Sequence, residues 1–264
     1  MKKVAIIQSI NQANEIKNLV DAFILPIEHF SINYDKTFNL NEIKEIINTN
    51  KEIFISVNKN IHNKELEKLE NLLIQIDKLN IKGIIFYDIA IINLKTKLKL
   101  KTDLVWAEEH LTTNYQTINY WHEKGCKYAY LSSELTKEEI DEISKNTKAT
   151  LFLNVFGHLP MFTSRRHLVS NYLEYFNIKD KGKNKRIYKE EKHYPIKENT
   201  HGTTVFSDYV LNAVDIDFNI DYLVYNSYLI EEETFKEVLQ GKSVLPSKHG
   251  FLFKETIYKV KNNE

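Results

Sequence analysis

Short runs of β-branched and aromatic residues alternate with helical patterns along most of this chain, and that alternation limits its fold more than any other feature. An order of strand, helix and strand implies parallel pairing with right-handed crossovers. The runs predicted as strands are Val4–Gln8, Ile24–His29, Glu52–Asn58, Gly83–Tyr87, Asp103–Ala107, Tyr128–Ser132, Thr150–Phe156 and Tyr222–Tyr225. We therefore expect an α/β fold with a parallel (β/α) barrel of TIM type, complete or distorted, and an open doubly wound sheet is the alternative. A dinucleotide-binding fold is disfavoured because no glycine-rich turn follows any predicted strand.

Apolar spacing also predicts the helices between these strands. Leucine and isoleucine recur every three or four residues over Leu66–Leu79, which places them on one helix face. A second helix begins at Thr136, with Glu139 at the position of a capping box. The segment Thr112–Glu123 is predicted as a third helix, with Ile118 and Trp121 facing inward.

The length of 264 residues fits one large α/β domain, so we predict a single domain over residues 1–264. Between the seventh and eighth strands lies a polar, charge-dense stretch. We predict residues 179–207 as a loop or insertion, which gives the domain an elaborated C-terminal third.

Composition excludes several classes of protein. Lysine plus arginine equals aspartate plus glutamate at 36 each, so any RNA contact has to be local. The single cysteine, Cys126, cannot form an internal disulfide, a zinc site or a four-thiolate cluster. The apolar run Val4–Ile7 is too short for a signal peptide or a membrane span. We expect a cytoplasmic protein without a membrane partner and without a metal site.

Functional groups of a β/α barrel collect where strands end. That rule selects Asn58, Asp88, Glu108, Glu134 and Asn154, together with His158 in the run Gly157–Met161. Asp88, Glu134 and His158 are the candidate catalytic residues, and Asn58 and Asn154 are candidate ligand-binding residues. The alternative for each is an ordinary strand-end hydrogen bond or helix cap.

Two of the three arginines, Arg165 and Arg166, stand side by side before His167 at the predicted start of a helix. Guanidinium groups bind carboxylate or phosphate through two parallel hydrogen bonds, and a helix N-terminus adds partial positive charge. We predict an anion-binding site formed by Arg165, Arg166 and His167, and a solvated arginine pair is the alternative.

A hydrolytic nucleophile finds little support in the residues. Cys126 precedes a predicted strand, at the end of a barrel opposite to catalysis. No Gly-x-Ser-x-Gly elbow or His-Glu-x-x-His spacing is present.

Several segments together resemble the collagenase-like peptidase family U32. Leu131–Ile140 is similar to a strand-to-helix signature of that family, Arg-Glu-Leu-Ser-x-x-Glu-Ile. The other matching segments are Asn154–Met161, Ser164–Leu168, Tyr194–Asn199, His201–Ser207, Val57–Asn58 and Tyr87–Asp88. The resemblance implies a β/α barrel. It also implies two competing activities, a collagenase-like peptidase (a hydrolase) and a component of tRNA modification that forms 5-hydroxyuridine at the wobble position with prephenate as hydroxyl donor.

The departures from the family pattern are equally informative. His167 stands where the family places its first cluster cysteine, so the iron–sulfur cluster that many members carry is not expected here. Ser133 and Asn154 replace a common arginine and a common glutamate, and Val224–Tyr228 lacks the charges of the family's last strand. The resemblance therefore favours a tRNA hydroxylation component acting with a paralogous, cluster-bearing U32 subunit and with tRNA. A peptidase and a non-catalytic partner subunit are the alternatives.

Overall fold

The computed structural model describes residues 1–108, 111–180, 182, 185–242, 244–246 and 248–254. Eight parallel strands form a closed barrel, because β6 pairs with β7 and β13 pairs with both β7 and β1. The barrel strands are β1 (Lys2–Ile6), β2 (Ala22–Pro26), β3 (Glu52–Val57), β4 (Gly83–Phe86), β5 (Asp103–Trp106), β6 (Tyr128–Tyr130), β7 (Thr150–Gly157) and β13 (Tyr222–Asn226). The predicted parallel barrel is confirmed, and the open sheet is excluded.

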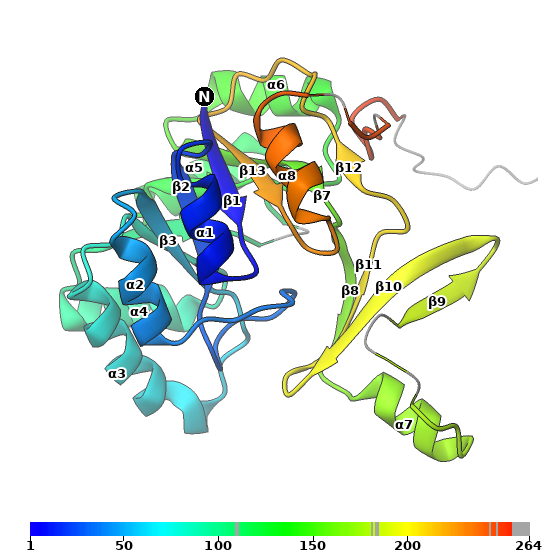
Figure 1. Cartoon of the computed structure of the whole chain (residues 1–264). Helices are drawn as coiled ribbons and strands as arrows, with labels where there is room; N and C mark the ends of the chain where they lie inside the picture. Colours follow the sequence, from blue (N-terminus) through cyan, green and yellow to red (C-terminus); the bar gives the residue numbers. More distant parts are fainter. Residues whose placement is uncertain (109–110, 181, 183–184, 243, 247, 255–264) are drawn as a thin grey trace, which may run out of the picture.

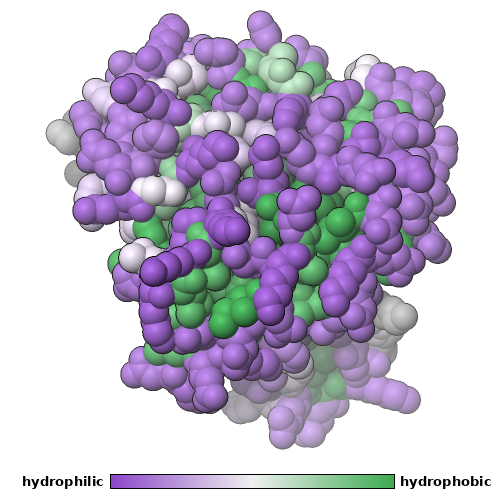
Figure 2. All heavy atoms as spheres, turned by 90° about the vertical axis from the view of Figure 1, so that its left-hand side faces the viewer, coloured by the Kyte–Doolittle hydropathy of each residue, from purple (hydrophilic) through white to green (hydrophobic). Residues whose placement is uncertain are grey.

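Helices cover the outside of this barrel (Figure 1). They are α1 (Ile10–Ile16), α2 (Leu40–Ile47), α3 (Leu66–Asp77) with the short 3-10 turn η1 (Asn63–Glu65), α4 (Ile89–Leu98), α5 (Tyr115–Glu123), α6 (Lys137–Asn146) and α8 (Glu232–Leu239). Leu69, Leu73 and Ile76 of α3 are buried as the spacing predicted, and α6 begins at Thr136 with the predicted capping box. On the side viewed in Figure 2 the surface is mostly hydrophilic, and its hydrophobic side chains gather in one area.

Barrel strands are buried on both faces, which is why they read as almost unbroken apolar runs. Within the barrel, the rings of Phe54, Tyr128, Phe152 and Tyr222 pack against one another. Phe152 stacks on Tyr222 with centroids 4.4 Å apart and meets Phe54 edge-on at 4.9 Å. Below them, at the N-terminal end, Glu52 accepts hydrogen bonds from Lys2 Nζ (2.8 Å) and Tyr222 Oη (2.7 Å). The lower barrel is therefore filled, and only its C-terminal end can hold a ligand.

Between β7 and β13 the chain builds a second, antiparallel sheet in the order β8-β11-β10-β9. Its elements are β8 (Pro160–Ser164), α7 (Leu168–Tyr175), β9 (Arg186–Lys189), β10 (Lys192–Asn199) and β11 (Gly202–Phe206), and the short β12 (Leu211–Asn212) pairs with β7. Most of the stretch predicted as a loop or insertion, 179–207, thus consists of strands. Both faces of β9 are exposed, so its sequence does not alternate between apolar and polar residues. Without that alternation a strand could not be predicted there.

Gly202 makes this sheet possible where β10 turns into β11. Its φ is +126°, and a Cβ atom there would lie 2.0 Å from the carbonyl oxygen of Ser164. Only glycine allows β11 to approach β8 this closely. In the described part of the chain, no helix is long and apolar enough to cross a membrane.

Candidate functional site

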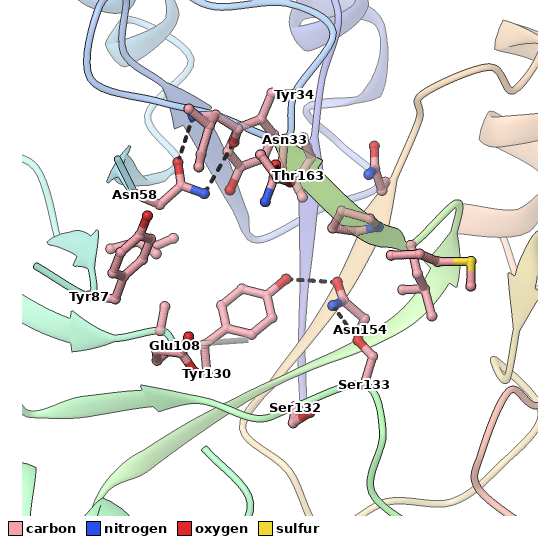
Figure 3. Close-up of a pocket in the computed structure, with 18 of the residues that line it drawn as sticks. Asn33, Tyr34, Asn58, Tyr87, Glu108, Tyr130, Ser132, Ser133, Asn154 and Thr163 are labelled. Carbon is pink, nitrogen blue, oxygen red and sulfur yellow. Dashed lines mark hydrogen bonds between the residues drawn. The ribbon is translucent and has the colours of Figure 1, made fainter. Parts of the chain in front are cut away.

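A cavity of about 310 Å³ opens at the C-terminal end of the barrel. Strand ends supply most of its lining, and the loop after β2 and strand β8 close it from above (Figure 3). The polar and aromatic lining residues are Asn33, Tyr34, Asn58, Tyr87, Glu108, Tyr130, Ser132, Ser133, Glu134, Asn154, His158, Phe162, Thr163 and Asn226. Of the residues predicted from sequence, Asn58, Glu108, Glu134, Asn154 and His158 are therefore brought together here.

Asn154 connects two strand ends at the floor of the cavity. Its Oδ1 accepts a hydrogen bond from Tyr130 Oη at 2.7 Å, and its Nδ2 donates to Ser133 Oγ at 3.1 Å (Figure 3). Both partners come from β6 and the turn after it, so one side chain of β7 fixes the position of an aromatic ring in the lining. A half-buried amide with both ends paired is a preorganised group.

Asn58 holds the loop after β2 over the cavity. Its amide accepts from the backbone N–H of Ile32 at 3.0 Å and donates to the carbonyl of the same residue at 3.1 Å. One residue further along this loop, Asn33 Oδ1 accepts a hydrogen bond from Thr204 Oγ1 of β11 at 3.2 Å. The loop thus joins the barrel to the second sheet, and Asn58 serves as its anchor.

The described lining contains two carboxylates, Glu108 and Glu134, and neither lysine nor arginine. Three tyrosine rings, Tyr34, Tyr87 and Tyr130, stand around the space (Figure 3). Four side-chain amides, which also hydrogen-bond within the protein, complete it: Asn33, Asn58, Asn154 and Asn226. Such a surface favours a flat, polar and uncharged ligand over an anion.

His158 follows β7 directly and faces the cavity with restricted freedom. Its Nδ1 lies 3.0 Å from the carbonyl oxygen of Ser207, and its ring meets Tyr228 edge-on. Burial lowers the pKa of the His158 imidazole, and Arg186 adds to that effect. The neutral ring is the form expected at neutral pH, in which Nδ1 donates its proton to the carbonyl of Ser207.

A pH-dependent contribution to stability follows from this histidine. Because its pKa is lower when folded than the ordinary 6.5, the unfolded chain binds the proton first, and stability is lost as the pH falls below about 6.5. We expect His158→Gln to reduce the stability lost between pH 7.5 and pH 5.5, as measured by urea unfolding at both values. The exposed His193 supplies the control substitution, and an unchanged pH dependence in His158→Gln would contradict the argument.

Asp88 is on the same rim but outside the lining. Its Oδ1 accepts from the N–H of Ala90 at 2.9 Å and caps α4, and its Oδ2 accepts from the N–H of Ile61 at 2.7 Å. Both carboxylate oxygens of Asp88 thus accept hydrogen bonds from backbone N–H groups, as expected if Asp88 is a helix cap and not a catalytic residue. Its predicted catalytic role gains no geometric support.

The predicted anion site also lies outside the lining. Arg165 donates to the carbonyl of Asn60 at 2.7 Å and contacts the ring of His62, while Arg166 and His167 are exposed. At the start of α7 the amides of Val169 and Ser170 already bind the carboxylate of Glu198, at 2.7 and 3.1 Å. Burial alone would raise the pKa of Glu198. The hydrogen bonds from these amides and from the hydroxyls of Ser170 and Thr203 outweigh burial and lower that pKa. The helix N-terminus is therefore occupied by the protein's own anion.

The residues present do not fit a four-cysteine iron–sulfur cluster. Cys126, the single cysteine, is buried just before β6, at the opposite end of the barrel from the cavity. Burial raises the pKa of its thiol to about 12, so it stays protonated. In the described part of the chain, no group of three or more His, Cys, Asp or Glu side chains is placed to hold a metal ion.

Sequence reasoning missed several lining residues. Tyr34, Tyr87, Tyr130 and Asn226 were not selected as site residues, although each belongs to the cavity. For the strand residues a signal exists, because alternate positions face the barrel interior: Tyr130 follows Tyr128, and Asn226 follows Val224 and Tyr222. Tyr34 lies in a loop, where no such period applies.

Comparison with known proteins identifies the family. The model of peptidase family U32 matches residues 9–225. The chain belongs to peptidase family U32. Among curated relatives, this U32 protein is similar to tRNA hydroxylation protein P2 of Bacillus subtilis (strain 168), with 26% identity over 98% of this chain and 100% of the relative. It is also similar to tRNA hydroxylation protein P1 of that organism, with 24% identity over 52% of this chain and 33% of the relative.

Solved structures support the same fold. The U32 peptidase Mk0906 superposes with a TM-score of 0.58 at 9% identity, over 86% of this U32 chain and 92% of that one. The tryptophan synthase complex from Pyrococcus furiosus superposes with a TM-score of 0.50 at 12% identity, over 91% and 95%. At such identities the likeness concerns the barrel alone.

Proposed function

We propose that this U32 protein is a component of tRNA hydroxylation and that its barrel cavity receives a uracil base. Its likeness to P2 over nearly the full length of both chains supports the activity. The observation that carries the choice of ligand is the cavity lining, with three tyrosine rings, four amides and, among described residues, no lysine or arginine.

A uracil base suits such a lining because it is flat, neutral and polar. Tyrosine rings stack on the face of a base. The amides of Asn58 and Asn154 each keep one N–H and one oxygen lone pair beyond their bonds to the protein, which suits a carbonyl oxygen and the N–H of a base. The wobble uridine lies in the anticodon loop, where an unpaired base enters a pocket at a smaller cost than a base held in a duplex.

The expected hydroxyl donor, prephenate, is a dicarboxylate. The described lining of the cavity contains two carboxylates and neither lysine nor arginine, so it would repel such a donor. We therefore place the base, and not the donor, in this cavity. In this scheme the donor and any cluster belong to a paralogous U32 subunit, which agrees with the existence of two related proteins, P1 and P2, in one organism.

The peptidase alternative receives no comparable support from the geometry. His158 contacts a backbone carbonyl, and no serine hydroxyl of the described residues hydrogen-bonds to a histidine ring. A nucleophile paired with a base is what covalent peptide hydrolysis requires.

The test is the modification state of tRNA in the native host. Deleting the gene is expected to abolish 5-hydroxyuridine and its derivatives at the wobble position, measured by mass spectrometry of digested tRNA, and a plasmid copy should restore them. Unchanged modification in the deletion strain would exclude the proposal. A non-catalytic partner is distinguished by complementation with cavity variants: full restoration by all of them would show that the cavity is not used.

A further inference from the structure

The second sheet and α7, formed by the described residues between 160 and 206, make an arm that stands away from the barrel (Figure 1). The charge of the chain is divided between this arm and the rest. Residues 160–206 hold ten of the 36 lysines and arginines but only five of the 36 aspartates and glutamates. This stretch of sequence is therefore net +5 and the remainder −5, although the chain as a whole is neutral. All three arginines of the chain lie in the arm.

Two of these guanidinium groups are available to a ligand. Arg166 and Arg186 are exposed, and neither guanidinium has a hydrogen-bond or ion-pair partner among the described residues. Arginine forks match the geometry of phosphate oxygens. Arg165, by contrast, is held by Asn60 and His62 and connects the base of the arm to the barrel rim.

The same arm carries exposed aromatic rings. Tyr175 is 81% exposed, Tyr188 65%, Tyr172 57% and Phe176 54%, and no residue of α7 is buried. An eight-residue helix without a buried face has little stability of its own. Bonds from the backbone of Leu168, Val169 and Ser170 to Thr203 and Glu198 hold its first turn. Tyr172 and Tyr175 contact Phe176, and all three rings stay largely exposed.

Cations and exposed rings on one element are the pattern of a surface that binds unpaired nucleic acid, in which cations follow the phosphates and bases stack on the rings. Strand β8 runs from this surface to the cavity, because Met161, Phe162 and Thr163 also line the cavity. We propose that the arm is an RNA-binding element that holds tRNA while a base from it enters the barrel. This inference rests on the proposed function for the identity of the RNA.

The experiment measures binding of an unmodified tRNA transcript to the purified full chain by fluorescence anisotropy over a range of salt concentrations. Replacing both free guanidinium groups, Arg166→Ala with Arg186→Ala, is expected to weaken binding by about tenfold or more and to lower the slope of log affinity against log salt by about two. The matched control, Lys145→Ala with Lys148→Ala, removes two exposed charges at the far end of α6 and should leave both quantities unchanged.

Stacking is tested separately from charge. Tyr175→Ala is expected to weaken binding at least about fivefold, whereas Tyr175→Phe keeps the ring and should bind as the unaltered chain does. Because Tyr175 is exposed, the melting temperature should not change in either variant.

Absence of tRNA binding by the unaltered chain, or unchanged affinity in the arginine and tyrosine variants, would overturn the inference. Unchanged affinity together with lost co-purification of a paralogous U32 subunit would assign the arm to a protein partner instead. If gene deletion abolishes wobble hydroxylation but the arm variants bind RNA normally, the RNA-binding role of the arm is rejected and the proposed function stands. If the arm variants lose RNA binding but the deletion strain keeps wobble hydroxylation, the proposed function is rejected and the RNA-binding role of the arm stands.

Discussion

Replacing Phe152 with alanine is expected to destabilise the chain by about 3 to 5 kcal/mol, measured as the free energy of unfolding in urea. Phe152 is fully buried within the barrel. Its ring stacks on Tyr222 and Tyr130 and meets Phe54 edge-on. Three strands besides β7 would lose packing at once, and closed barrel walls cannot collapse into the space that is left.

The matched control is Phe176→Ala, which deletes the same side chain from an exposed position in the arm. Its cost is expected to stay within about 0.5 kcal/mol. Phe152→Leu, which refills most of the volume, should lie between the two. Equal stability of Phe152→Ala and Phe176→Ala would mean that the ring cluster does not support the barrel.

Replacing Asn154 with alanine is expected to lower wobble hydroxylation at least about tenfold, equivalent to roughly 1.4 kcal/mol or more, in a strain whose only copy carries the variant. The substitution removes the acceptor for Tyr130 Oη and the donor to Ser133 Oγ, so the ring loses a hydrogen bond that helps to orient it in the cavity. Hydroxyuridine is measured by mass spectrometry of bulk tRNA.

Asn146→Ala supplies the control, because that exposed amide, at the end of α6, donates to the carbonyl of Glu142 and to no other described residue. Binding of tRNA to the arm should be the same in both variants, which separates loss of the cavity from loss of the RNA surface. Full hydroxylation with Asn154→Ala would show that this network does not position the reacting base.

Sequence by itself determined the parallel α/β class and much of its framework. Strands buried on both faces must be apolar throughout, and short helices need caps, so β1–β7, β13 and the start of α6 at Thr136 could be predicted. Strand-end position also selected Asn58, Glu134, Asn154 and His158 correctly as neighbours at one mouth, because parallel strands end on the same side.

Only the tertiary structure decided barrel closure, the use of each polar group and the arm. Closure rests on β6 pairing with β7 and on β13 pairing with β1, contacts between segments up to about 220 residues apart that no local pattern encodes. Whether a strand-end oxygen faces a ligand or a backbone amide depends on where a distant loop passes. Asp88 is an example, because its Oδ2 accepts a hydrogen bond from the backbone N–H of Ile61. The charged residues of β9 and β10 show no apolar period from which strands could be predicted. Only the antiparallel pairing of the two strands in the tertiary structure places these residues on one surface.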